Sequence, residues 1–200
     1  MAIKSSITLL RHANALPARD DSPSADLCRS LSPKGLRQTD RRRVLLGERP
    51  YGLAISSPAT RAYETAQNVA AIEPTAVTIF PSLYWLNDGK AFKEAVELMF
   101  DELQYKPLAE YRKHRLGYML DDQARQAWMR MQSLNLRGKK TLLVGHAILA
   151  NALGCQMVGT LTKEWAYLSE TAFDECSGVT IHWEDSEVVK VDRHEGMNVE

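Results

Sequence analysis

The stretch SSITLLRHA, residues 5 to 13, joins a short apolar run directly to an arginine and a histidine. Residues 5 to 10 alternate in polarity and then become fully apolar, which is typical of a strand that enters a buried sheet. The run stops abruptly at Arg11 and His12. The stretch therefore predicts a first strand that delivers two chemically useful side chains to its carboxyl end.

Similar short apolar runs recur along the chain and alternate with segments that carry helix signals. Ser32 and Pro33 are typical of a helix N-cap and first position, and Ser57 with Pro58 repeats the signal. This alternation predicts an α/β fold, a three-layer α/β/α arrangement with a mostly parallel central sheet covered on both faces. The expected strands are residues 5–10, 52–56, 77–80, 141–145, 178–183 and 187–191.

The alternation of strand-like and helix-like segments stops between residues 86 and 138, where no convincing strand occurs. Two stripes of apolar residues at helical spacing predict a helical excursion there, which we expect to cap the active-site end of the sheet. No internal repeat or Pro/Gly-rich linker divides the chain. We therefore expect residues 1–200 to form one domain with this cap as an insertion.

Composition and charge exclude several classes of protein. Lys plus Arg and Asp plus Glu both number 25, so no net charge directs the protein to nucleic acid or to an anionic membrane. The apolar runs are too short to span a bilayer, and the first residues lack the apolar centre of a signal peptide, which predicts a cytoplasmic location. Cys28, Cys155 and Cys176 suggest neither disulfides nor a zinc site.

Polar side chains follow three of the expected strands. Arg11 and His12 end the first, Arg61 comes shortly after the second, and His146 follows the strand 141–145. In open α/β sheets, ligands bind at the carboxyl ends of the strands, so we expect these side chains to meet. Arginine forks suit phosphate oxygens, and a neutral imidazole between cations is able to attack phosphorus. The cluster predicts a phosphate pocket with a histidine nucleophile.

Rival phosphatase chemistries are missing from the sequence. The residues six places after the three cysteines are Lys34, Leu161 and His182, so no C-x5-R loop of a cysteine phosphatase is present. The chain also lacks a D-x-D motif, a nucleotide P-loop and a G-x-S-x-G motif. Phosphoryl transfer through histidine is the chemistry that fits.

Three motifs, in this order, resemble the histidine phosphatase superfamily, also called phosphoglycerate mutase-like. They are LLRHA (9–13), SSPATRAYETA (56–66) and VGHA (144–147), and the likeness extends over residues 5 to 192. LSPKGLRQ (31–38) and DECSGVTIHW (174–183) also resemble family segments. The resemblance implies that His12 is the phosphorylated nucleophile and that Arg11, Arg61 and His146 hold the phosphate. It implies no metal and no organic cofactor.

The chain departs from the family pattern beside both histidines and at the general acid. Ala15 replaces the family's Thr or Ser, and Ala147 follows His146 where glycine is frequent. Ala13 stands where glycine is usual, which would strain the backbone if the position needs a positive φ. Neither position that carries the general acid in the family holds a carboxylate here, because Trp85 lies near the position of the family's glutamate and Ala147 follows the second histidine. Asp88 is the nearest replacement and Glu94 the next, although Asn-Asp-Gly at 87–89 is equally typical of a turn.

These features leave three functions open. The first is a phosphatase that hydrolyses a phosphomonoester or phosphohistidine, on a small molecule or a phosphoprotein, through a phosphohistidine on His12. The alternatives are a phosphomutase primed by a bisphosphate and a phospho-ligand binding module without turnover. If the acid is absent, phosphohistidine is favoured as substrate, because its leaving group needs less protonation. Oligomeric state is not predicted.

Two charged segments each have two interpretations, contact with a ligand or partner and simple solvation. Residues 41–43 are three consecutive arginines, for which a solvated helix face is a simpler interpretation than an acidic partner. The segment EYRKHR, residues 110–115, falls within the excursion. Contact with substrate and simple solvation fit it equally well.

Overall fold

The computed structural model describes residues 2–47, 51–84, 102–103, 106–160 and 162–197. Its central sheet has six strands, and each lies where the sequence predicts one: β1 (Lys4–Arg11), β2 (Leu53–Ser56), β3 (Val77–Ile79), β4 (Lys140–Gly145), β5 (Gly178–Glu184) and β6 (Glu187–His194). The strand order is β3-β2-β4-β1-β5-β6. The first four in this order run parallel, whereas β5 is antiparallel to β1 and β6 to β5.

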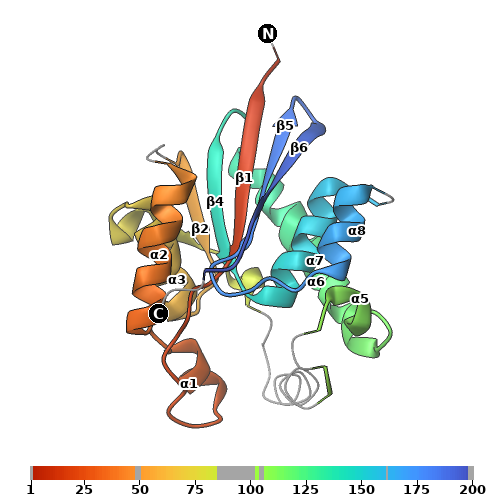
Figure 1. Ribbon diagram of the computed structural model, residues 1–200. Coiled ribbons are helices and arrows are strands. Elements are labelled where there is room, and N and C mark those ends of the chain that lie inside the picture. The colour runs from red at the N-terminus through yellow and green to blue at the C-terminus, as the bar shows by residue number, and fades with distance from the viewer. Residues whose placement is uncertain (1, 48–50, 85–101, 104–105, 161, 198–200) are drawn as a thin grey trace.

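Helices cover both faces of the sheet, which confirms the predicted three layers (Figure 1). Alternate residues of the strands supply the two cores, because successive side chains of a strand point to opposite faces. Among the described residues, the longer helices are α2 (Pro33–Leu46), α3 (Thr60–Ala70), α6 (Arg115–Met131), α7 (Ala147–Val158) and α8 (Lys163–Glu170). Leu10 and Leu142 pack with α2 and α3 on one face, and Leu9 and Leu143 pack with α6, α7 and α8 on the other.

Shorter helical segments lie between these elements. They are α1 (Pro23–Leu27), α5 (Leu108–Tyr111) and the single turns η1 (Pro74–Ala76), η2 (Pro81–Leu83) and η4 (Gln132–Leu134). The segment α1 lies beyond the carboxyl end of β1, at the edge where the predicted site residues leave the sheet (Figure 1).

One of the two predicted helix starts is right and the other is wrong. Ser32 caps α2 by accepting a hydrogen bond from Gly35 N at 3.1 Å, and Pro33 takes the first position. The second helix, α3, begins at Thr60, two residues later than a Ser57 cap would place it. Ser57 instead hydrogen-bonds His146, and its Oγ accepts from Ala59 N in the bend before the helix.

The predicted excursion divides into two parts. Residues 85–101, where the cap was expected to begin, lie outside the described residues. Farther along, α6 packs along α7 through Leu120, Ala124 and Ala127, so it belongs to a layer on one face of the sheet. Arg112, in the segment 110–115, donates to both carboxylate oxygens of Asp121 at 2.9 and 2.8 Å. This arginine therefore links the segment 110–115 to α6 within that layer.

Gly35 allows the first turn of α2 to press against the loop that follows His12. A Cβ at this position would lie 2.0 Å from the carbonyl oxygen of Asn14. Gly35→Ala should therefore lower the free energy of unfolding by about 1–3 kcal/mol, because backbone must move to admit the methyl group. Urea denaturation followed by circular dichroism measures the change.

Gly52→Ala is the matched control, since its Cβ would make only ordinary contacts at 3.7 Å or more. We expect that variant to change the free energy of unfolding by less than about 0.5 kcal/mol. Equal losses in the two variants would show that the close approach of Gly35 to Asn14 is not what constrains the position.

Candidate active site

Sheet topology brings the two predicted histidines together. Because β1 and β4 are parallel neighbours, Arg11 pairs with Gly145, and His12 N donates to Gly145 O at 2.9 Å. The residues that follow each strand are therefore adjacent. The ring centroids of His12 and His146 lie 5.1 Å apart with an interplanar angle of 66°.

The ring of His12 is fixed in one orientation by its two nitrogen atoms. Nδ1 lies 2.7 Å from the carbonyl oxygen of Ala13, which only accepts, so Nδ1 carries the proton in this contact. In the neutral ring Nε2 then carries no proton, and its lone pair is able to accept a hydrogen bond. The Nε–H group of Arg61 donates to this atom at 3.2 Å. The geometry thus directs Nε2 toward a guanidinium group, where an anion would also bind.

Both histidines favour the neutral form. Burial, followed by the neighbouring His146 and Arg61, holds the pKa of His12 well below its usual value. Burial and Arg61 likewise lower the pKa of His146. Arg11, whose Nη1 donates to Phe173 O at 2.9 Å, contributes to both shifts. A neutral imidazole keeps the lone pair that nucleophilic attack requires.

We expect the His12 ring to titrate well below the ordinary histidine value of about 6.5. The lowered pKa means that the ring stays neutral at pH 7 and is protonated only on stronger acidification. Unfolding restores an ordinary pKa, so the corresponding stability is present above about pH 6.5 and is lost as the pH falls toward the folded value. NMR titration of the ring protons, assigned with His12→Ala, measures the midpoint. A midpoint at or above 6.5 would contradict the burial argument.

The RAxxTA part of the second motif has a structural explanation. Arg61 lies in the first turn of α3 and is almost fully buried. Ala62 and Ala66 are fully buried in the core cluster on this face of the sheet. Thr65 Oγ1 accepts from Ala13 N at 3.1 Å and donates to Arg61 O at 2.7 Å. The motif therefore holds the loop after His12 against α3.

Ala13 is not strained by the absence of glycine. It does not adopt a positive φ, and its methyl group is fully buried in a small cluster with Leu31, Cys176 and Met197. The replacement of glycine is thus compatible with the backbone, and the strain considered for this position does not occur.

Three residues that the sequence analysis did not identify complete the surroundings of Arg61 and His146. Asp26, in α1, forms an ion pair with Arg61 at 2.8 Å and accepts a hydrogen bond from Tyr84 Oη at 2.5 Å. The Tyr84 ring lies edge-on to His146, with centroids 5.1 Å apart. Arg29 pairs with Asp26 at 3.1 Å. No motif or periodicity marks these residues, since they meet only in the folded chain.

Asp88, Glu94 and Trp85 lie outside the described residues. The four other predicted site residues, Arg11, His12, Arg61 and His146, form one cluster together with Ser57, whose Oγ lies 2.8 Å from His146 Nε2.

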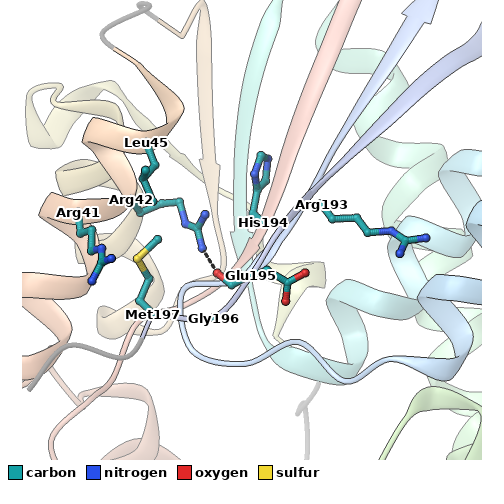
Figure 2. A pocket seen from close by; sticks show the side chains of 8 residues that line it. All are labelled: Arg41, Arg42, Leu45, Arg193, His194, Glu195, Gly196 and Met197. Carbon is teal, nitrogen blue, oxygen red and sulfur yellow. Dashed lines mark hydrogen bonds between the residues drawn. The ribbon is translucent and has the colours of Figure 1, made fainter.

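A cavity of about 470 Å³ lies between α2 and the end of β6, and it is distinct in its lining from the histidine cluster (Figure 2). Arg41 and Arg193 border it but point away from each other, so they do not converge on one anion. Arg42 is buried and donates to the carbonyl oxygens of Cys176 and Glu195. The interpretation of residues 41–43 as a solvated face is therefore wrong for Arg42, which anchors the chain after β6.

Among the residues that the structure describes, no group of three or more His, Cys, Asp or Glu side chains is arranged to hold a metal ion. The absence of a metal or cofactor from the reaction stays a prediction. No described helix is both long enough and apolar enough to cross a membrane.

Three solved structures with similar folds bear the names of phosphatases. A phosphoserine phosphatase from Entamoeba histolytica is 15% identical, with a TM-score of 0.64 over 96% of this chain and 98% of that one. The protein histidine phosphatase SixA, bound to tungstate, is 14% identical, with a TM-score of 0.61 over 95% and 96%. A mycobacterial glucosyl-3-phosphoglycerate phosphatase is 15% identical, with a TM-score of 0.59 over 98% and 100%. At these identities the likeness concerns the fold alone.

Fold and site together define an α/β protein with paired histidines and arginines at the carboxyl edge of its sheet. Residues 7–194 match the histidine phosphatase superfamily, branch 1. The chain belongs to this superfamily, as the three sequence motifs predict. Comparison with the curated proteins gives no match.

Proposed function

We propose that this protein is a phosphatase in which His12 Nε2 attacks phosphorus and forms a covalent phosphohistidine. The observation that carries the proposal is the hydrogen bond from His12 Nδ1 to Ala13 O, which leaves the Nε2 lone pair directed at Arg61. A phosphoryl group placed between them would meet both a nucleophile and a cation.

The proposed reaction has two steps: the phosphoryl group is transferred first to His12 and then to water. In the first, the bond from Nε2 to phosphorus forms while the bond to the substrate's leaving oxygen or nitrogen breaks, and the leaving group takes a proton. In the second, water attacks phosphorus and gives a proton back to the group that protonated the leaving group, the bond to Nε2 breaks with its electron pair returning to the imidazole, and inorganic phosphate leaves. Arg11, Arg61 and His146 stabilise the charge on the phosphoryl oxygens in both steps.

The proposed substrates are phosphomonoesters or phosphohistidine, carried by a small molecule or a phosphoprotein. A phosphomutase would differ by returning the phosphoryl group from His12 to a substrate oxygen instead of water. A binding module would hold phosphate in the same cluster without forming the covalent bond.

A rapid-quench experiment tests the proposal. The purified protein is mixed with nitrophenyl phosphate, quenched at alkaline pH, and examined by intact and peptide mass spectrometry. One phosphoryl adduct on the peptide that contains His12 is expected, together with release of inorganic phosphate. Absence of both, with thermal protection by inorganic phosphate, would identify a binding module, and turnover only after priming by a bisphosphate would identify a mutase.

Asp88 is proposed as the general acid that protonates an alkoxide leaving group. Asp88→Asn should lower kcat for alkyl phosphates at least about tenfold more than kcat for nitrophenyl phosphate, whose leaving group needs less protonation. Steady-state kinetics with the two substrates measure the difference. Equal effects on both would assign Asp88 to the turn instead, and Glu94→Gln would then be the next variant to compare.

A further inference from the structure

The guanidinium group of Arg61 is held at all three of its nitrogen atoms. Nη2 donates to Asp26 Oδ2 at 2.8 Å and Nη1 donates to the backbone oxygen of Asp26 at 2.5 Å. Nε donates to His12 Nε2 at 3.2 Å. Only 6% of the Arg61 side chain is exposed. One aspartate therefore fixes the far edge of the guanidinium group while the near edge faces the proposed nucleophile.

Asp26 is itself held firmly. Its segment α1 is capped by Ser22, whose side chain accepts from Ala25 N at 3.1 Å and whose carbonyl accepts from Asp26 N at 3.1 Å. Arg29 Nη1 donates to Oδ1 at 3.1 Å, so both carboxylate oxygens are engaged. The carboxylate is thus a defined support and not a mobile surface charge.

Tyr84 connects Asp26 to the second histidine. Its hydroxyl donates to Asp26 Oδ2, and the edge of its ring contacts the ring of His146. Removal of the Asp26 side chain would release one anchor of Arg61 and the hydrogen-bond partner of Tyr84 together. Arg61 and the Tyr84 ring beside His146 therefore share one support, the Asp26 carboxylate.

The same contacts argue against Asp26 as the proton donor. Burial alone would raise the pKa of Asp26, but Arg61 and the Tyr84 hydroxyl lower it below the ordinary value. A general acid needs a proton to give at neutral pH, so its pKa is usually raised. At pH 7 Asp26 is a carboxylate whose lone pairs are already used by donors.

We propose that Asp26 is a positioning residue, which holds the Nε edge of Arg61 beside His12 so that an incoming phosphoryl group replaces the contact between them. This role rests on the proposed function. The bonds to Asp26 persist while Arg61 Nε exchanges His12 Nε2 for a phosphoryl oxygen, and the exchange frees the nucleophile's lone pair. Pre-organised donors of this kind cost no reorganisation during the reaction.

Asp26→Ala and Asp26→Asn are the variants that test this role. In Asp26→Ala we expect kcat to fall about 10- to 100-fold, because a misdirected donor costs transition-state binding. The dissociation constant for inorganic phosphate should change less than about threefold, because the positive charge of Arg61 remains. Asp26→Asn should recover part of kcat, since its amide oxygen is still able to accept from Nη2. Alkyl and nitrophenyl phosphates should be affected equally.

Asp40→Asn is the matched control, because Asp40 forms an exposed ion pair with Arg43 on α2, at 3.1 Å. Circular dichroism checks that each variant is folded. Unchanged kcat in Asp26→Ala would overturn the proposal, as would a selective loss with alkyl phosphates, which would make Asp26 the general acid. A loss of phosphate affinity that matches the loss of kcat would also overturn it.

A second readout separates this proposal from the proposed function. The Arg61 Nε–H signal in ¹⁵N NMR, assigned with Arg61→Lys, reports the orientation of the guanidinium group without any turnover. We expect a protected signal in the wild type that is lost or shifted in Asp26→Ala and kept in Asp40→Asn. A wild-type protein without turnover but with this pattern would overturn the phosphatase proposal and support the positioning contact. An unchanged signal in Asp26→Ala would overturn the positioning role.

Discussion

His12→Ala is expected to lower phosphate-ester turnover by at least about 10³-fold, because removal of a nucleophile closes the covalent route. Alanine also removes the acceptor of the Arg61 Nε–H group, so the guanidinium group stays held by Asp26 alone. The phosphate-binding cations remain in place. The variant should therefore still bind inorganic phosphate while it forms no phosphoryl adduct.

Stopped-flow kinetics with nitrophenyl phosphate, adduct mass spectrometry and phosphate titration measure these three properties in one preparation. His182→Ala is the matched control, since His182 on β5 contacts Asp192 on β6 at 2.9 Å and is not part of the histidine and arginine cluster. Turnover in His12→Ala within tenfold of the wild type would exclude His12 as the nucleophile. An adduct that persists in this variant would assign the nucleophile to another residue.

Arg61→Ala is expected to lower kcat on the order of 10²-fold, the usual effect of losing one pre-organised donor to a charged transition state. The cause is local, because this side chain is buried and its guanidinium group donates a hydrogen bond to Nε2 of His12. The variant also leaves the Asp26 carboxylate near the pocket without its main partner. Weaker phosphate binding is therefore expected together with the lower rate.

Arg37→Ala, an exposed substitution on α2, is the control for the loss of a positive charge. Steady-state kinetics and calorimetric titration with inorganic phosphate give the two effects, and circular dichroism checks the fold. If Arg61→Ala and Arg37→Ala behave alike, Arg61 has no part in the reaction.

His146→Ala should lower kcat by more than about tenfold, a smaller loss than in Arg61→Ala, because its imidazole contributes one hydrogen bond to the phosphoryl oxygens.

The strands could be predicted because their signal is local. Residues 5–10 alternate in polarity and end in an apolar pair, and residues 141–145 contain the apolar run Leu-Leu-Val, as strands of a buried sheet do; both lie in the centre of the sheet. The start of α3 could not be predicted in the same way. Ser57 and Pro58 carry an ordinary helix signal, but the Ser57 hydroxyl is drawn to His146, a residue from another strand.

Local sequence patterns also could not predict which charged side chains are buried. Arg42 has the same sequence context as Arg41 and Arg43, yet it is buried because the backbone carbonyls of Cys176, just before β5, and Glu195, just after β6, both accept from it. Its neighbours remain at the surface, and Arg43 pairs with Asp40. The difference depends on which face of α2 meets the last segment of the chain.

The sequence by itself determined the strands, the layers and the four residues of the histidine and arginine cluster. These follow from patterns within short segments and from the rule that parallel strands end at one edge of a sheet. Only the tertiary structure decided which groups surround that cluster. Asp26 and Tyr84 lie 58 positions apart in the chain, and Asp26 and Arg61 lie 35 apart. Their contacts exist because α1, α3 and the segment after β3 are packed against one another, which no local pattern encodes.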